Sequence, residues 1–356
     1  MPTTIPADLD LVELHRFAAE LAIQAGSYLR DQALARTFAG GAGTAFSESI
    51  QIKENAADLV TRADMHSEQL ISGMIRERYP THRIIGEETY PAGQEKRFLL
   101  DDDPTWIVDP LDGTVNFVHL FPTCCVSVGF CVNKVPVAGA IFAPILGGLH
   151  LTNAQRSLFS AAQGLGSWST PISFPYSSSA LSPPPSPSPS PTGKPQPWQH
   201  AVPLPYIPPQ PLPPDAPKGC LFTAEWGKAR SDAPESNLTK KANSLWNMAA
   251  EIGGRGGKGG MVHGIRSLGS ATLDMDVCAG YILITESGGR VVPSQPPAVV
   301  LADPSAPIPD ADLGSRLYCA VRACAGTEDE TAEQAQNGHI REVRRRMKKL
   351  DYQRPQ

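Results

Sequence analysis

The amino-acid sequence predicts a layered α/β fold, because patterns typical of helices and of strands alternate along both halves of its 356 residues. Apolar residues at three- and four-residue steps predict helices over about 8–34, with Asp8 or Asp10 as cap, and over 63–79. Short apolar runs and alternating stretches predict strands in the first half, at 83–85, 106–108, 124–143 and 149–160. The second half repeats the alternation, with strands at 219–222, 261–267 and 290–292 and helices at 236–253, 270–275 and 276–286.

The overall composition excludes several classes of protein. The formal net charge of −5 argues against a general nucleic-acid binder, and no apolar run is long enough to span a membrane. The first residues lack the basic and apolar regions of a secretory signal, and the seven cysteines form no CxxC pair. We therefore expect a reduced, cytoplasmic protein that binds neither nucleic acid nor membrane.

A change of composition divides the chain into four expected regions. Residues 171–217 are dominated by Pro and Ser, which build neither helix nor central strand, so we expect a disordered insert there. A PxxP ligand for a partner module is the alternative, and a passive insert is the preferred interpretation. The other expected regions are an N-terminal α+β half with the metal-binding motif at 1–170, a C-terminal α/β half at 218–325, and a charged, partly helical tail at 326–356.

The segment 106–117 carries the chemistry. An apolar strand leads to Asp109, and Pro110 biases Asp109 away from the helical region, so its carboxylate is expected at the strand end. Asp112 follows after a turn, with the Leu111 carbonyl between the two carboxylates. Hard cations such as Mg²⁺ prefer these oxygen ligands. On this pattern alone, an Asp- and Gly-rich turn without a ligand is an equally good interpretation.

The flanking residues favour the ligand site. Residues 106–122 (Trp-Ile-Val-Asp-Pro-Leu-Asp-Gly-Thr-Val-Asn-Phe-Val-His-Leu-Phe-Pro) closely resemble the signature of the inositol monophosphatase family. Further segments resemble the other motifs of that family: 58–64, 85–88, 263–271 and 276–289. The resemblance covers about 10–170 and 218–325, and details near the C-terminus are similar to fungal members, some of which accompany quinate catabolism.

This resemblance implies a five-layer α/β/α/β/α sugar-phosphatase fold and a Mg²⁺-dependent hydrolase. The expected reaction is hydrolysis of inositol monophosphate to inositol and phosphate by metal-activated water, and dimers are usual in the family. Since phosphate monoesters hydrolyse very slowly without a catalyst, a cation cluster that neutralises the dianion and supplies hydroxide suits this chemistry.

The family pattern also implies a role for each matching residue. Glu87, Asp109 and the Leu111 carbonyl would bind the first metal, and Asp109, Asp112 and Asp276 the second. Thr114, oriented by Asp64, would help to deprotonate the attacking water, together with Glu87 as a catalytic residue. The N–H groups of Gly113 and Thr114 would hold the phosphate. Ser270 and Ala271 would contact substrate, and Lys53 resembles a family lysine that faces the site.

The chain departs from the family pattern before Asp276. The family has the rest of a helix, a strand and a tryptophan there, whereas in this chain Met275 runs directly into Asp276. This is either an artefact of gene prediction or splicing, or a true variant with impaired activity. Two alternatives to an inositol monophosphatase follow: a catalytically impaired relative that acts as a binding or regulatory protein, and a phosphatase for another small sugar or nucleotide phosphate.

Overall fold

The protein is described by a computed structural model that covers residues 9–38, 50–52, 59–86, 100–147, 155–184, 190, 192–214, 216, 233–234, 236, 239–240, 243, 277–295, 297–313 and 317–347. The chain forms two compact units. The first comprises residues 1–206 and 274–287, and the second comprises 207–273 and 288–356. The chain therefore passes between the units at 206/207, 273/274 and 287/288. The regions expected from composition meet at 170/171, 217/218 and 325/326.

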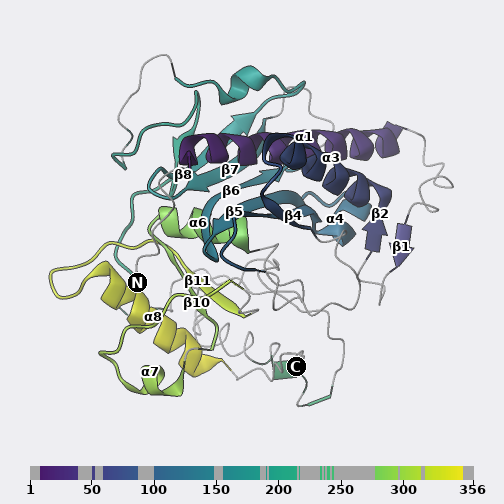
Figure 1. Cartoon of the computed structure of the whole chain (residues 1–356). Helices are drawn as coiled ribbons and strands as arrows, with labels where there is room; N and C mark the ends of the chain where they lie inside the picture. Colours follow the sequence, from purple (N-terminus) through teal and green to yellow (C-terminus); the bar gives the residue numbers. More distant parts are fainter. Residues whose placement is uncertain are drawn as a thin grey trace. The chain divides into compact units, whose positions relative to one another are not determined.

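A seven-stranded sheet forms the centre of the first unit, in the order β3-β4-β5-β6-β7-β8-β9. Figure 1 labels its strands β4 to β8. The strands are β3 (Arg83–Gly86), β4 (Thr105–Asp112), β5 (Cys125–Val132), β6 (Val135–Ala143), β7 (Arg156–Ala162), β8 (Gly166–Ile172) and β9 (Val202–Pro203). Strands β3 and β4 are parallel, and every other neighbouring pair is antiparallel. A separate pair, β1 (Ile50–Ile52) and β2 (Leu59–Thr61), is antiparallel.

Two long helices cover one face of this sheet. Helix α1 (Leu11–Phe38) packs on β5, β6 and β7, and α3 (Arg62–Arg78) packs on α1 and β4 (Figure 1). The α1 helix has a long buried stripe, which includes Phe17, Leu21 and Leu29. None of the helices within the described ranges is long and apolar enough to cross a membrane.

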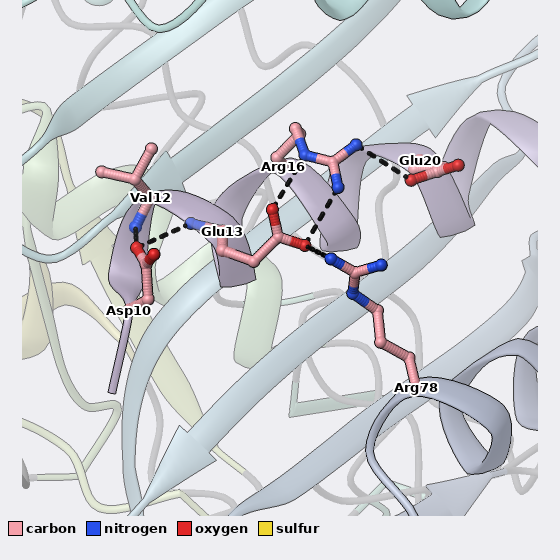
Figure 2. Close-up of polar contacts among 6 residues, drawn as sticks. All are labelled: Asp10, Val12, Glu13, Arg16, Glu20 and Arg78. Atoms are coloured by element: carbon pink, nitrogen blue, oxygen red, sulfur yellow. Dashed lines mark hydrogen bonds and ion pairs between the residues drawn. The ribbon is translucent and has the colours of Figure 1, made fainter. Parts of the chain in front are cut away.

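Polar contacts at the start of α1 agree with the predicted cap. The Asp10 carboxylate accepts hydrogen bonds from the backbone N–H groups of Val12 (3.1 Å) and Glu13 (3.0 Å) (Figure 2). The Glu13 carboxylate also binds Arg16 (2.9 and 3.0 Å) and Arg78 of α3, which links the two helices. These groups are partly exposed, so each ion pair contributes at most about 1 kcal/mol to stability.

Helix α6 (Cys278–Glu286) packs against the opposite face of the sheet, on β5, β6, β7 and β8. Two glycines allow this close contact: a Cβ atom on Gly129 would overlap the Cys278 side chain, and one on Gly139 would lie 2.8 Å from Ala279 Cα. Because side chains alternate along a strand, these odd-numbered positions face away from the α1 side, where Phe130 and Phe142 are buried. The first unit thus has α/β/α layers.

The Pro-rich segment (here residues 173–184 and 192–206) differs from the expected disorder. It contains the 3₁₀ helix η2 (Ser178–Leu181), and its strand β9 adds to the edge of the sheet at β8. The Trp198 side chain is only 2% exposed; its Nε1–H donates to Thr170 Oγ1 (2.7 Å), and its ring lies 4.7 Å from that of His15 in α1. A few apolar side chains between the prolines therefore bury enough surface to order the chain.

The second unit contains a smaller core. Strands β10 (Arg290–Pro293) and β11 (Tyr318–Val321) are antiparallel, and the unit also holds α7 (Ala298–Ala302) and α8 (Ala332–Arg346). Val292, Ile308 and Ile340 form part of its core. Thr331 and Gln334 form a reciprocal cap at the start of α8, so the region expected to be a charged, partly helical tail contains a well-bounded helix.

The observed elements agree with the mixed α/β class predicted from the sequence. The predicted helices at 8–34, 63–79 and 276–286 correspond to α1, α3 and α6, and the predicted strands at 83–85, 106–108 and 290–292 correspond to β3, β4 and β10. The predicted elements at 219–222, 261–267 and 270–275, and most of 236–253, lie outside the described residues.

Candidate metal and phosphate site at the end of β4

A β-bulge at the end of β4 places Asp109 and Asp112 of the predicted site on the same face of the sheet. Asp109 pairs with Ser127 of β5, and Asp112 pairs with Cys125, so three steps along β4 correspond to two along β5. The extra residue lies in the Pro110–Leu111 stretch, where a proline interrupts the ladder of hydrogen bonds. Because of this extra residue, Asp109 and Asp112 are paired with two β5 residues of the same face, Ser127 and Cys125.

The buried carboxylate of Asp109 organises this turn. Its side chain is 2% exposed, and Oδ1 accepts a hydrogen bond from the Leu111 N–H (3.0 Å). This contact closes a tight turn at Pro110. The Leu111 carbonyl belongs to the residue directly before Asp112. A carboxylate is costly to bury unless hydrogen bonds or cations stabilise its charge. Asp109, Leu111 and Asp112 therefore form an oxygen-rich set that suits a hard cation.

Gly113 and Thr114 connect the bulge to the short helix α4 (Thr114–Val118). Gly113 has φ +83°, and a Cβ atom there would lie 2.9 Å from the Thr123 carbonyl oxygen, so glycine is required for both reasons. The Thr114 hydroxyl donates to the Leu111 carbonyl (3.1 Å), which holds its oxygen beside the candidate metal ligands. Asn116 Nδ2 donates to the Thr123 carbonyl (2.8 Å) and fixes the returning chain before β5.

The start of α3 supplies Asp64, which is 1% exposed. Strand β2 contacts α4 and leads directly into α3, so Asp64 and Thr114 come from elements that share β2 as a neighbour. One helical turn after Asp64, the fully buried carboxylate of Glu68 packs against Gly86 of β3. A Cβ atom on Gly86 would lie 2.5 Å from the Glu68 carboxyl carbon, which explains the glycine of the Gly-Glu-Glu motif.

The remaining predicted site residues lie outside the described residues: Lys53, Glu87, Ser270, Ala271 and Asp276. The elements next to two of them are described. Strand β3 runs parallel to β4 with Gly86 opposite Val108, so the last residue before Glu87 is level with the last residue before Asp109. On the other side, α6 follows Asp276 after Val277 and begins against Gly129, two residues from the Ser127 partner of Asp109.

Two polar residues at the site were missed by the sequence analysis. The Cys125 thiol is 4% exposed and lies 3.7 Å from Asp112 Oδ2, within hydrogen-bonding distance for sulfur. Glu68 is the other. Its signal was present in the sequence, because Asp64 and Glu68 are spaced four residues apart on a predicted helix, whereas the contact of Cys125 depends on strand pairing.

The oxygen ligands at the β4 bulge supply part of what a divalent cation needs. The described ranges, which exclude Glu87 and Asp276, contain no group of three or more His, Cys, Asp or Glu side chains that could hold a metal ion by themselves. Two carboxylates and a backbone carbonyl at one bulge still match the chemistry of Mg²⁺, which takes few protein carboxylates and keeps waters and phosphate oxygens. The residues present thus fit the first part of a metal site.

A layered α/β sheet whose strand end offers carboxylate and carbonyl oxygens suits a metal-dependent hydrolase of small phosphate esters. The sequence model of the inositol monophosphatase family matches residues 10–344. The chain therefore belongs to the inositol monophosphatase family, whose members generally depend on metal ions and act on small phosphate substrates.

Full-length relatives support the same assignment. Protein qutG of Emericella nidulans is 41% identical, with 97% of this chain and 96% of the relative covered. The quinic acid degradation cluster protein x of Neurospora crassa is 40% identical, with 99% and 98% covered. Inositol monophosphatase 1 of Saccharomyces cerevisiae is 28% identical, with 90% and 92% covered.

Solved structures show the same fold. The inositol monophosphatase of Anabaena (Nostoc) sp. superposes with a TM-score of 0.51 at 20% identity, with 96% of this chain and 98% of that chain covered. The extragenic suppressor protein suhB of Bartonella henselae gives a TM-score of 0.51 at 19% identity, with 96% and 99% covered. These matches confirm the predicted fold class.

Proposed function

We propose that this chain is a Mg²⁺-dependent phosphomonoesterase that hydrolyses inositol monophosphate to inositol and phosphate. The observation that carries the proposal is the bulge in β4, where a buried carboxylate, a second carboxylate and a carbonyl occur together beside the Thr114 hydroxyl. Inositol monophosphatases are among its relatives, from yeast and from human.

In the proposed site, Glu87, Asp109 and the Leu111 carbonyl hold one Mg²⁺ ion, and Asp109, Asp112 and Asp276 hold a second. Two strand ends support the first set, since Gly86 and Val108 are paired neighbours on parallel strands. Helix α6 begins against Gly129 of β5, and this placement supports the proposal that Asp276, just before α6, lies near the end of β4. When bound, Mg²⁺ would neutralise the phosphate, lower the pKa of water and stabilise the leaving oxygen.

The protein groups would position the substrate and move the proton. The Thr114 hydroxyl, which lies beside the Leu111 carbonyl, would accept a hydrogen bond from the attacking water and pass its own proton to the Asp64 carboxylate that orients it, and Glu87 would help to place that water. The N–H groups of Gly113 and Thr114 would hold the phosphate, with Ser270 and Ala271 near the substrate. Helix α4 has only five residues, so direct N–H contacts matter more here than a helix dipole.

One observation favours a second candidate, a catalytically impaired relative with a binding or regulatory role. By the family resemblance, a segment that precedes Asp276 in the family is missing here, where Met275 runs directly into Asp276, and its loss would shorten the tether of one proposed metal ligand. A phosphatase for another small sugar or nucleotide phosphate is the remaining alternative. We further expect a cytoplasmic homodimer, as the family resemblance implies.

Phosphate release from inositol 1-phosphate tests the proposal. We expect turnover that requires Mg²⁺ and stops on addition of EDTA, and that returns when excess Mg²⁺ is restored. Fructose 1,6-bisphosphate and an adenosine bisphosphate serve as competing substrates under the same conditions. Turnover that is unaffected by EDTA would overturn the mechanism. Faster turnover of either competing compound would show that inositol 1-phosphate is not the preferred substrate.

A further inference from the structure

An exposed stretch of the second unit, Ile207–Pro214, carries a proline pattern that the phosphatase site does not use. Pro208, Pro211 and Pro214 recur at every third residue. A polyproline II helix has three residues per turn, so these prolines would line one side of such a helix. All three are exposed, whereas Leu212 and Pro213 are partly covered. We call Pro208, Pro211 and Pro214 the proline ridge.

Covalent geometry favours this conformation along the stretch. Proline fixes φ near −65°, and a residue that precedes proline is biased toward extended or polyproline II geometry. Every residue of Ile207–Pro214 is itself a proline or directly precedes one, and none belongs to a helix or strand; the stretch begins with a bend at Ile207 and ends in a turn at Pro214, where the Ala216 N–H donates to the Pro213 carbonyl (2.9 Å). At 3.1 Å per residue, a ridge from Pro208 to Pro214 would span roughly 19 Å.

A side chain of the second unit holds the middle of the stretch. Arg322, which follows β11, donates from Nη1 to the Gln210 carbonyl (3.3 Å) and from Nη2 to the Pro211 carbonyl (3.5 Å). These two contacts lie on the backbone and leave the rings of Pro208, Pro211 and Pro214 exposed. A ligand that is already extended and tethered loses less conformational entropy on binding.

The chemistry of the stretch indicates what would bind it. Five of its eight residues are prolines, which lack an N–H group. The carbonyls of Pro208, Gln210, Pro211 and Pro213 already accept hydrogen bonds within the described part of the chain, which leaves those of Pro209 and Leu212 as acceptors for donors on a partner. Grooves that recognise polyproline II helices place proline rings between aromatic side chains and donate hydrogen bonds to the carbonyls. Residues 201–214 contain no Asp, Glu, Lys or Arg, and the neighbouring Arg322 guanidinium is already bound to the Gln210 and Pro211 carbonyls. A groove that depends on an ion pair with a charge inside its ligand therefore finds none in this stretch.

We propose that the proline ridge is a docking site for a protein module with an uncharged, aromatic-lined groove for polyproline II helices. The binding energy would come from the three proline rings and from the carbonyls of Pro209 and Leu212 between them, and the interaction is independent of the phosphatase site.

Binding of the full chain to purified profilin, a module that binds poly-L-proline in an aromatic groove, tests this inference. We expect saturable binding in isothermal titration calorimetry, competed by poly-L-proline. The double variant Pro208→Ala/Pro211→Ala should bind at least about tenfold more weakly. The matched control Pro209→Ala, on an exposed proline outside the ridge, should bind within twofold of the unmodified chain. Thermal unfolding checks that each variant is folded.

Three results would overturn the inference. One is the absence of saturable binding to profilin. Another is equal weakening by Pro208→Ala/Pro211→Ala and Pro209→Ala, since the effect would then not depend on the ridge. The third is tighter binding to an SH3 domain with an acidic specificity pocket than to profilin, because that would assign the partner to a groove that requires a charged ligand.

Discussion

The end of β4 and the Pro-rich segment are both attached to the seven-stranded sheet, but they rely on different interactions. At β4, polar atoms determine the local structure: the Asp109 carboxylate binds the Leu111 N–H, and the Thr114 hydroxyl binds the Leu111 carbonyl. In the Pro-rich segment, apolar burial dominates, with Trp198 packed beside His15 and Leu181 buried. Substitutions at the first region should therefore change activity, and substitutions at the second should change stability.

The largest expected effect is on activity, from Asp112→Asn. An amide cannot replace the charge of a metal-binding carboxylate, so we expect phosphate release from inositol 1-phosphate to fall by at least about 10³-fold. The thermal midpoint should change little, since Asp112 is partly exposed. Asp103→Asn, an exposed aspartate just before β4, is the matched control and should leave activity unchanged. Equal activity of the two variants would remove Asp112 from the site.

A second effect concerns the chain before Asp276. If its short connection misplaces Asp276, insertion of a family-like segment between Met275 and Asp276 should raise the rate by about 10²-fold, because small misplacements of catalytic groups have costs of this size. The comparison is made at saturating Mg²⁺ with the unmodified chain. Equal rates would show that the connection is tolerated, and the impaired-relative alternative would lose its support.

In the Pro-rich segment, Trp198→Ala should lower the free energy of unfolding by about 3–5 kcal/mol, the usual cost of deleting a buried aromatic side chain. Deletion of residues 177–200 should be destabilising for the same reason, contrary to what the composition suggests. Guanidinium denaturation followed by far-UV circular dichroism measures both. The control is Gln199→Ala, an exposed neighbour. If Trp198→Ala matches the control, the segment does not stabilise the first unit.

The pH dependence of stability provides a further test of this packing. Burial lowers the pKa of His15 from 6.5 to about 3. Since the folded-state pKa lies below the unfolded value, the stabilisation is complete above pH 6.5 and is lost as pH falls toward 3. Between pH 6.5 and 5, His15 should account for a loss of about 2 kcal/mol. His15→Leu should reduce this slope, whatever its effect at neutral pH; an unchanged slope would show that His15 is not buried in its neutral form.

The smallest effect should come from Cys125. Its thiol is a weak donor 3.7 Å from Asp112 Oδ2, so Cys125→Ala should raise the Mg²⁺ concentration for half-maximal activity only about threefold. Cys125→Ser keeps a donor and should restore most of the affinity. A loss of maximal rate in both variants, without a change in Mg²⁺ dependence, would instead indicate altered packing of β5.

The predictive value of the sequence also differed between these regions. At β4 the apolar run marked the strand, and the pattern of Asp109, Leu111, Asp112 and Gly113 together with the family resemblance selected the candidate site, whose role as a metal site stays a prediction. The bulge that aligns them depends on pairing with β5, which a single segment does not reveal.

In the Pro-rich segment, composition was misleading because ordering depends on a few side chains. Trp198 finds its partners, Thr170 and His15, 28 and 183 positions away along the chain, and these contacts exist only after the sheet and α1 have packed. The same limit applies to Cys125, whose contact with Asp112 arises from register.

Calorimetric titration of Mg²⁺ into the full chain tests the central claim most directly, because it does not require a fully active enzyme. The account predicts a saturable binding isotherm for the unmodified chain and for Asp103→Asn, and a loss of most of that heat in Asp112→Asn. An isotherm for Asp112→Asn that matches the unmodified chain, or no saturable binding in any of the three proteins, would contradict the assignment of the β4 bulge as a metal site.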